Sequence, residues 1–212
     1  MIYIWQVMEP ITIIFSIVIL IMSVVIHELS HGYVAVLLGD PTPRLQGRLT
    51  LNPLKHLEFF GSFMVPFITS IASAGSFTFG WAKPVEWNPY NIKNKRIGEL
   101  LIASAGVSAN FLIAVIFSLF IRFSDFFSGS FLELAAYVVL INIVLVVFNL
   151  IPIPPLDGSK VLFCILPQTP FFQKLRYSIE RHSFVLMIII ALFLWRIVEP
   201  VVPYIFHAIT GI

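Results

Sequence analysis

Long apolar stretches without charged side chains are the feature that most restricts how this chain can fold. Neither residues 10–26 nor residues 100–121 contain a charged side chain. A helix needs about 20 such residues to cross the hydrocarbon core of a bilayer. Only 11% of the 212 residues are charged, whereas a soluble domain carries about a quarter. These stretches therefore predict an all-α integral membrane protein that crosses the bilayer several times.

The apolar stretches and the basic residues between them predict a topology. The stretches are 10–38, 59–81, 100–121, 134–156 and a last one from Ser183 to the C-terminus. Lysines and arginines follow the first, second and fourth stretches, which places these loops in the cytosol by the positive-inside rule. Both ends of 59–81 then lie on one side. We therefore expect about four transmembrane helices, with a re-entrant or short strand-containing segment between the first two.

Composition limits the remaining possibilities. Four or five spans occupy the chain almost completely, so residues 1–212 are expected to form a single membrane-embedded domain. The formal net charge of +2 is too small to suggest a nucleic-acid partner. Cys164 is the only cysteine, which excludes a disulfide within the chain and a thiolate cluster. A metal ion in this protein would therefore be held by His, Asp or Glu.

The first stretch contains the motif His27-Glu28-Leu29-Ser30-His31. Residues four apart share one face of a helix, so both imidazoles can bind one zinc ion while Glu28 acts as the general base of a metalloprotease. His27 lies about 16 Å from the helix end near Leu38, inside the hydrocarbon. A pair of histidines bonded to neighbouring helices is the alternative. Ionisable groups are costly at that depth, however, and this favours a functional site.

Asp157 is the predicted third ligand, because a catalytic zinc site normally has three protein ligands and an open position. It is the only other carboxylate within the apolar stretches away from their ends. Prolines in 152–155 predict an extended chain, followed by a turn at Asp157-Gly158 and a short helix over 160–166. This span descends to the cytosolic side, as the first one does, so the three ligands are expected to meet at one depth. A helix N-cap is the alternative role for Asp157.

Two motifs in this order resemble the site-2 protease family of intramembrane zinc metalloproteases. The chain has His27–His31 in an early span and Asn149…Pro154-Pro155-Leu156-Asp157-Gly158 in a later one. The string 105–110 is similar to the AGPxxN pattern of the family, although Val107 stands where proline is usual, and 79–85 resembles a loop of its small bacterial members. The resemblance covers roughly residues 20–165 and implies a small member without a PDZ or CBS domain.

The resemblance also implies roles for individual residues. His27, His31 and Asp157 would bind one Zn²⁺ per chain, and Glu28 would activate the attacking water. Asn149 and Asn110 would contact the substrate backbone or the oxyanion. An interhelical hydrogen bond is the alternative role for each asparagine.

Together these features predict an intramembrane zinc metalloendopeptidase. The expected partners are the lipid bilayer, membrane-protein substrates cleaved in or near their transmembrane segments, and an unidentified regulatory partner, with no nucleic acid. The expected location is a prokaryotic inner membrane, with the active site near the cytosolic side. A metal or proton transporter using the same buried ligands is the alternative function, and a catalytically inactive scaffold is a third. The transporter would have paired repeats, and none is visible in the sequence.

Overall fold

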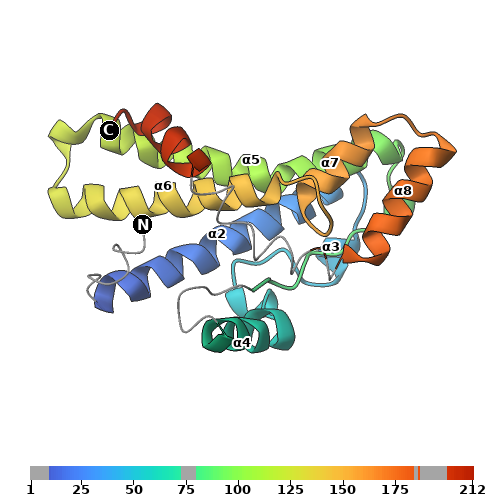
Figure 1. Ribbon diagram of the computed structural model, residues 1–212, viewed down its shortest axis with the longest axis horizontal. Coiled ribbons are helices and arrows are strands. Elements are labelled where there is room, and N and C mark those ends of the chain that lie inside the picture. Colours follow the sequence, from blue (N-terminus) through green and yellow to red (C-terminus); the bar gives the residue numbers. More distant parts are fainter. Residues whose placement is uncertain (1–9, 73–79, 184–185, 187–199) are drawn as a thin grey trace.

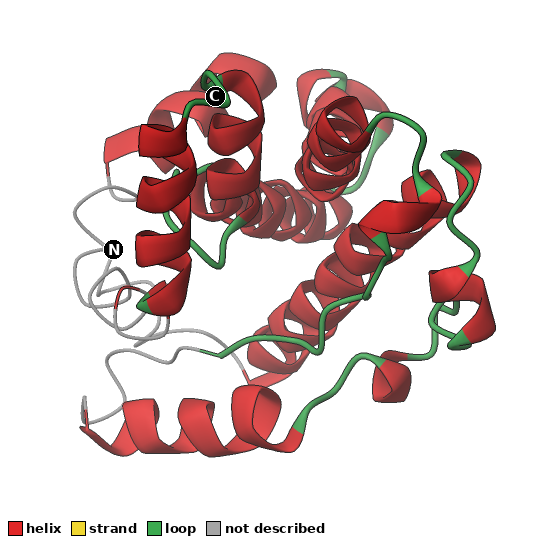
Figure 2. Cartoon of the chain, turned by 90° about the vertical axis from the view of Figure 1, so that its right-hand side faces the viewer, coloured by secondary structure: helices red, strands yellow, loops and turns green. Residues whose placement is uncertain are grey.

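The computed structural model describes residues 10–72, 80–183, 186 and 200–212. Its described part is helical and contains no strand (Figure 2). The α-helices are α2 (Pro10–Leu37), α3 (Thr42–Leu45), α4 (Val65–Ala72), α5 (Lys95–Arg122), α6 (Gly129–Asn149), α7 (Asp157–Ile165), α8 (Pro170–Arg181) and Pro200–Thr210. Shorter helical turns lie at Pro53–Lys55, Phe60–Met64, Pro89–Asn91 and 124–126.

Three long helices, α2, α5 and α6, form the body of the molecule (Figure 1). Each of the three packs against the other two. They are also the three described helices that are long and apolar enough to cross a membrane. The spans predicted at 10–38 and 100–121 are therefore confirmed as membrane-length helices. The fifth predicted stretch falls largely on 184–185 and 187–199, outside the described residues.

The fourth apolar stretch stops being helical before its prolines, as the sequence predicts. Helix α6 ends at Asn149, and residues 150–156 are not helical. Prolines interrupt the following residues, because proline cannot donate a backbone hydrogen bond and collides with the preceding turn. The short helix predicted over 160–166 begins earlier, at Asp157 itself. This places the Asp157 carboxylate on the first helical residue rather than in the turn before it.

Small residues let the long helices approach closely. Ala114 of α5 is fully buried with Val139 and Ile143 of α6, and Val202 of the C-terminal helix joins the same cluster. A polar contact also joins α6 to α2: the Asn142 side chain donates to the Ser23 hydroxyl at 3.0 Å. Interhelical hydrogen bonds of this kind hold membrane helices together at about 1 kcal/mol each.

The segment between α2 and α5 has no helix long enough to cross a bilayer among its described residues. A π-helical turn at Phe60–Met64 leads into α4, and the apolar helical region covers only Phe60–Ile71. The chain then returns, and the Trp81 N–H donates to the Gly61 carbonyl at 3.0 Å. The described part of this segment contains no strand, and re-entry into the membrane remains a prediction.

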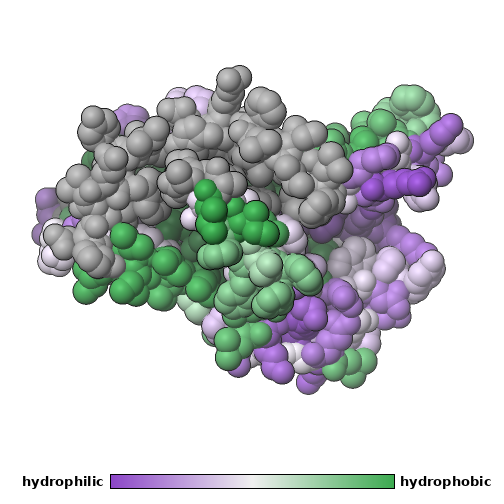
Figure 3. Space-filling view, turned by 60° about the horizontal axis from the view of Figure 1, so that its bottom comes forward, coloured by the Kyte–Doolittle hydropathy of each residue, from purple (hydrophilic) through white to green (hydrophobic). Residues whose placement is uncertain are grey.

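Hydrophilic side chains gather at one end of the molecule, where α3, α7 and α8 lie (Figures 1 and 3). Helix α8 is fastened there by Arg176, which contacts Glu99 of α5 at 2.5 Å and Glu180 at 2.7 Å. Hydrogen bonding to Glu99 raises the pKa of Arg176 above its ordinary value. This polar end is suited to an aqueous phase, and the apolar helix surfaces are suited to lipid.

Asp40 joins the loop after α2 to the loop before α5. Its fully buried carboxylate accepts hydrogen bonds from the N–H and hydroxyl of Thr42, from the Asn88 N–H and from the Asn91 amide. Burial alone would raise its pKa. The hydrogen bonds from Thr42, Asn91 and Asn88 outweigh burial, so they hold the pKa of Asp40 below its usual range.

Replacing Asp40 with asparagine is expected to destabilise the fold by about 2 kcal/mol at neutral pH, because donors would lose a charged acceptor. Ionised Asp40 stabilises the fold fully above the ordinary carboxyl pKa of about 4. This contribution is lost as the pH falls through the lowered pKa of the folded state. Thermal unfolding in detergent should therefore show a difference in stability between wild type and Asp40→Asn that becomes smaller in acid. A stability difference that does not change with pH would contradict this role.

Candidate metal centre

His27, His31 and Asp157 converge on one point in the interior. Asp157 Oδ2 lies 3.1 Å from His27 Nε2 and 3.0 Å from His31 Nε2. One ligand atom from each residue lies within 4.8 Å of the other two. All three residues are buried, although they come from helices 130 positions apart in sequence. His27 and His31 therefore lie on one face of α2, and Asp157 lies against both of them.

The groups around these side chains fit a zinc ion. His31 Nδ1 donates to the Ile102 carbonyl at 2.6 Å, which leaves the Nε2 lone pair facing the centre. Lys160 contacts the other carboxylate oxygen of Asp157 at 3.1 Å, which leaves Oδ2 for the metal. A His₂Asp set with one open position is a donor set that catalytic zinc accepts. Lys160 adds a positive charge next to the ligands, which the sequence pattern does not predict.

Helix α5 closes the centre with a glycine. A Cβ atom built on Gly106 would lie 2.5 Å from His31 Nε2 and 2.6 Å from His27 Nε2. The absence of a side chain therefore lets the α5 backbone lie directly over the two imidazoles. The string 105–110 is recognisable in the sequence, but this close approach depends on how α5 packs against α2.

Asp157 is held in place from both ends of α7. Before the helix, the chain passes through a cis Pro154-Pro155 bond, and Gly158 lies against the backbone of Leu150 and Ile151. After the helix, Arg96 of α5 donates to the carbonyl oxygens of Cys164, Ile165 and Leu166. The last carbonyls of a helix have no partner within the helix, and Arg96 supplies a donor to each of these three. The Asp157 side chain does not cap the helix, since no side-chain cap is formed there.

Glu28 lies one residue from the first histidine and is half-buried. Its Oε2 accepts a hydrogen bond from the backbone N–H of Val85 at 2.9 Å. Glu28 is predictable from the sequence, but Val85 is not. Val85 contributes a backbone N–H from 57 residues away, and its side-chain type does not indicate this contact. The one available signal was the string 79–85, which contains Val85.

The two asparagines are in different surroundings. Asn110 is fully buried one helical turn after Gly106, and neither its amide nitrogen nor its oxygen has a hydrogen-bond partner in the described part of the chain. Asn149 is half-buried at the C-terminus of α6 and donates to the Leu145 carbonyl at 2.9 Å. Substrate contact by either residue remains a prediction.

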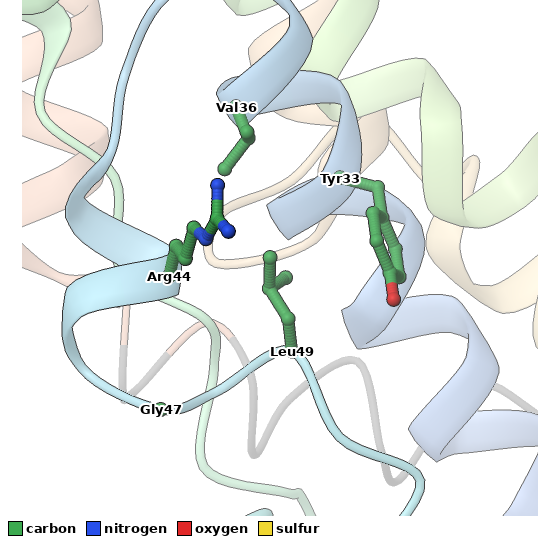
Figure 4. A pocket seen from close by; sticks show the side chains of 5 residues that line it. All are labelled: Tyr33, Val36, Arg44, Gly47 and Leu49. Atoms are coloured by element: carbon green, nitrogen blue, oxygen red, sulfur yellow. The ribbon is translucent and has the colours of Figure 1, made fainter.

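A cavity of about 400 Å³ lies beside the C-terminal part of α2 (Figure 4). Its lining comes from α2 and from the chain that follows it: Tyr33, Val36, Arg44, Gly47 and Leu49. Leu49 also borders Gly32, where a Cβ would lie 2.7 Å from its side chain. Gly32, one helical turn after Glu28, therefore lies beside one wall of this cavity.

Comparison with known proteins identifies the family of this chain. The sequence profile described as peptidase family M50 matches residues 124–190, which include Asp157. The chain belongs to this family, the site-2 protease family, and is a zinc metalloprotease.

Two relatives carry related names. "Putative zinc metalloprotease YwhC" of Bacillus subtilis is 34% identical over 184 residues, which cover 83% of this chain and 79% of that protein. "Putative zinc metalloprotease Rip2" of Mycolicibacterium smegmatis is 33% identical over 143 residues, which cover 67% of this chain and 53% of that protein. No solved structure matches the chain.

Proposed function

We propose that residues 1–212 form one intramembrane endopeptidase domain, with zinc held by His27, His31 and Asp157. The observation that carries this proposal is the convergence of their ligand atoms within 4.8 Å, inside a bundle of membrane-length helices. One zinc ion per chain would supply a Lewis acid that polarises the scissile carbonyl and makes water a stronger nucleophile.

Glu28 is the proposed general base. It accepts the proton of the attacking water and returns it to the leaving nitrogen, which is the usual division of labour in HExxH proteases. The Val85 contact occupies Oε2 and leaves Oε1 for this exchange. Lys160 contacts Asp157 Oδ1, and its positive charge favours the ionised carboxylate that ligation requires.

The proposed substrates are membrane proteins cleaved in or near a transmembrane segment, as in regulated intramembrane proteolysis. A peptide bond must be freed from its helix before attack, and the released backbone groups then need hydrogen-bond partners inside the bilayer. Asn149, at the end of α6, is a candidate partner through its side-chain oxygen, for which the described residues provide no donor. Asn110 is a second candidate that would require movement of α5. A regulatory partner would complete substrate choice.

We infer that the centre is reached from the cytosol, in the inner membrane of a prokaryote. The basic residues of the loops and the hydrophilic end of the molecule support this orientation (Figure 3).

Glu28→Gln tests the proposed function. The variant should retain about one zinc per chain, because the ligands are untouched, and should lose cleavage by about a thousandfold, because amides are poor bases. Zinc is measured on purified protein, and cleavage by proteomics of membrane fragments released by wild type but not by the variant. Equal fragment release by both proteins would refute the mechanism.

A further inference from the structure

The segment Trp81–Val85 runs between the turn that begins the re-entrant segment and the helix that carries Glu28. The N–H groups of alternate residues all point to one side. Trp81 donates to Gly61 at 3.0 Å, Lys83 donates to His56 at 2.8 Å, and Val85 donates to Glu28 at 2.9 Å. This alternation is that of one edge of an extended strand. We call Trp81–Val85 the strap.

The strap lies directly against α2. Val85 is only 6% exposed, and a Cβ built on Gly32 would lie 3.0 Å from its side chain. Gly32 is four residues after Glu28, so both lie on one face of the helix. The missing side chain at Gly32 therefore provides the space that brings the Val85 N–H to the carboxylate.

We propose that the Val85 N–H is a positioning group for the general base, which rests on the function proposed for Glu28. The hydrogen bond fixes Oε2, so that Oε1 alone is presented to water. Bonds to an ionised acceptor are stronger than neutral ones, and a carboxylate held in one orientation loses less freedom on reaching the transition state. The two other strap bonds, to His56 and Gly61, set the register and so couple the start of the re-entrant segment to the orientation of Glu28.

The inference is tested with Val85→Pro, which removes the N–H, and Val85→Ala, which keeps it. The probe is an internally quenched fluorescent peptide that contains one transmembrane segment cleaved by the wild type. Val85→Pro is expected to lower kcat about 10- to 100-fold, with KM and zinc content close to wild type. Val85→Ala should lower kcat by less than about threefold, because only side-chain packing is reduced.

Two further variants separate the lost donor from the effects of a proline ring. Ala82→Pro places the same ring in the strap where the N–H has no partner in the described part of the chain, and it should keep kcat. A backbone ester, made by inserting α-hydroxyvaline at position 85, removes the donor with almost no change of shape. It should lower kcat like Val85→Pro, and it remains decisive if the proline variant does not fold.

The outcomes distinguish this inference from the proposed function. An ester variant with the kcat of Val85→Ala would overturn the positioning role, and so would an ester variant that loses zinc, since the strap would then support the ligands instead. A wild type that cleaves no transmembrane peptide, or a Glu28→Gln variant that cleaves as fast as wild type, would overturn the proposed function.

Discussion

A Gly106→Ala variant is expected to weaken zinc binding by about 100-fold or more and to lose cleavage with it. The added methyl group would lie 2.5–2.6 Å from the Nε2 atoms of His31 and His27, which are the ligand atoms themselves. Neither ring can easily withdraw. His31 is held by the Ile102 carbonyl, and both imidazoles are buried between α2 and α5. Separation of the helices would itself disturb the centre.

The affinity of Gly106→Ala is measured by competition with a chelator, and Gly129→Ala serves as the control. Gly129 begins α6, and a Cβ at this position has no neighbour within 4 Å. Both substitutions replace a helical glycine with alanine, but only the alanine at position 106 meets other atoms. Wild-type zinc affinity in Gly106→Ala would mean that α5 does not lie over the histidines.

A Gly158→Ala variant is expected to reduce the free energy of unfolding by about 3 kcal/mol or to prevent the protein from accumulating. Its methyl group would overlap backbone atoms, including the Leu150 carbonyl carbon at 2.5 Å and the Ile151 oxygen at 2.7 Å. A side chain can rotate away from such a contact, but a backbone carbonyl moves only with its chain. The residues before α7, and Asp157 with them, would have to shift.

Thermal unfolding in detergent measures this loss of stability, with Gly129→Ala again as the control. Gly158→Ala and Gly106→Ala should affect different properties. Gly158→Ala is expected to lower stability even in metal-free protein, whereas Gly106→Ala should act mainly on metal affinity. A Gly158→Ala protein as stable as the control would show that the backbone around Leu150 can shift without loss of stability.

Much of the centre is predictable from the sequence because its ligands follow from local rules. The i, i+4 spacing of His27 and His31 defines one helix face, and Asp157 stands out as a lone carboxylate in an apolar stretch. Long uncharged stretches likewise predict α2, α5 and α6. Each of these inferences needs only helix geometry and the cost of burying charge.

The unpredicted parts depend on contacts between distant segments. The Ile102 carbonyl and the Val85 N–H are backbone groups that every residue except proline possesses, so residue type does not mark them. Gly106 shows its importance only when α5 lies on α2. The prolines after Asn149 correctly predict that the helix stops before them, but the sequence does not show that α7 begins at Asp157 rather than at residue 160.

The two-ended attachment of α7 limits where this protein can tolerate insertions and deletions. Arg96 binds the carbonyls that end the helix, and Asp157 begins it at the metal centre. One added residue between these points would turn the carboxylate by about 100° around the helix axis and move it about 1.5 Å along that axis. Length variation among related chains is therefore expected outside 157–166, and the distance from Arg96 to Gly106 along α5 should be kept for the same reason.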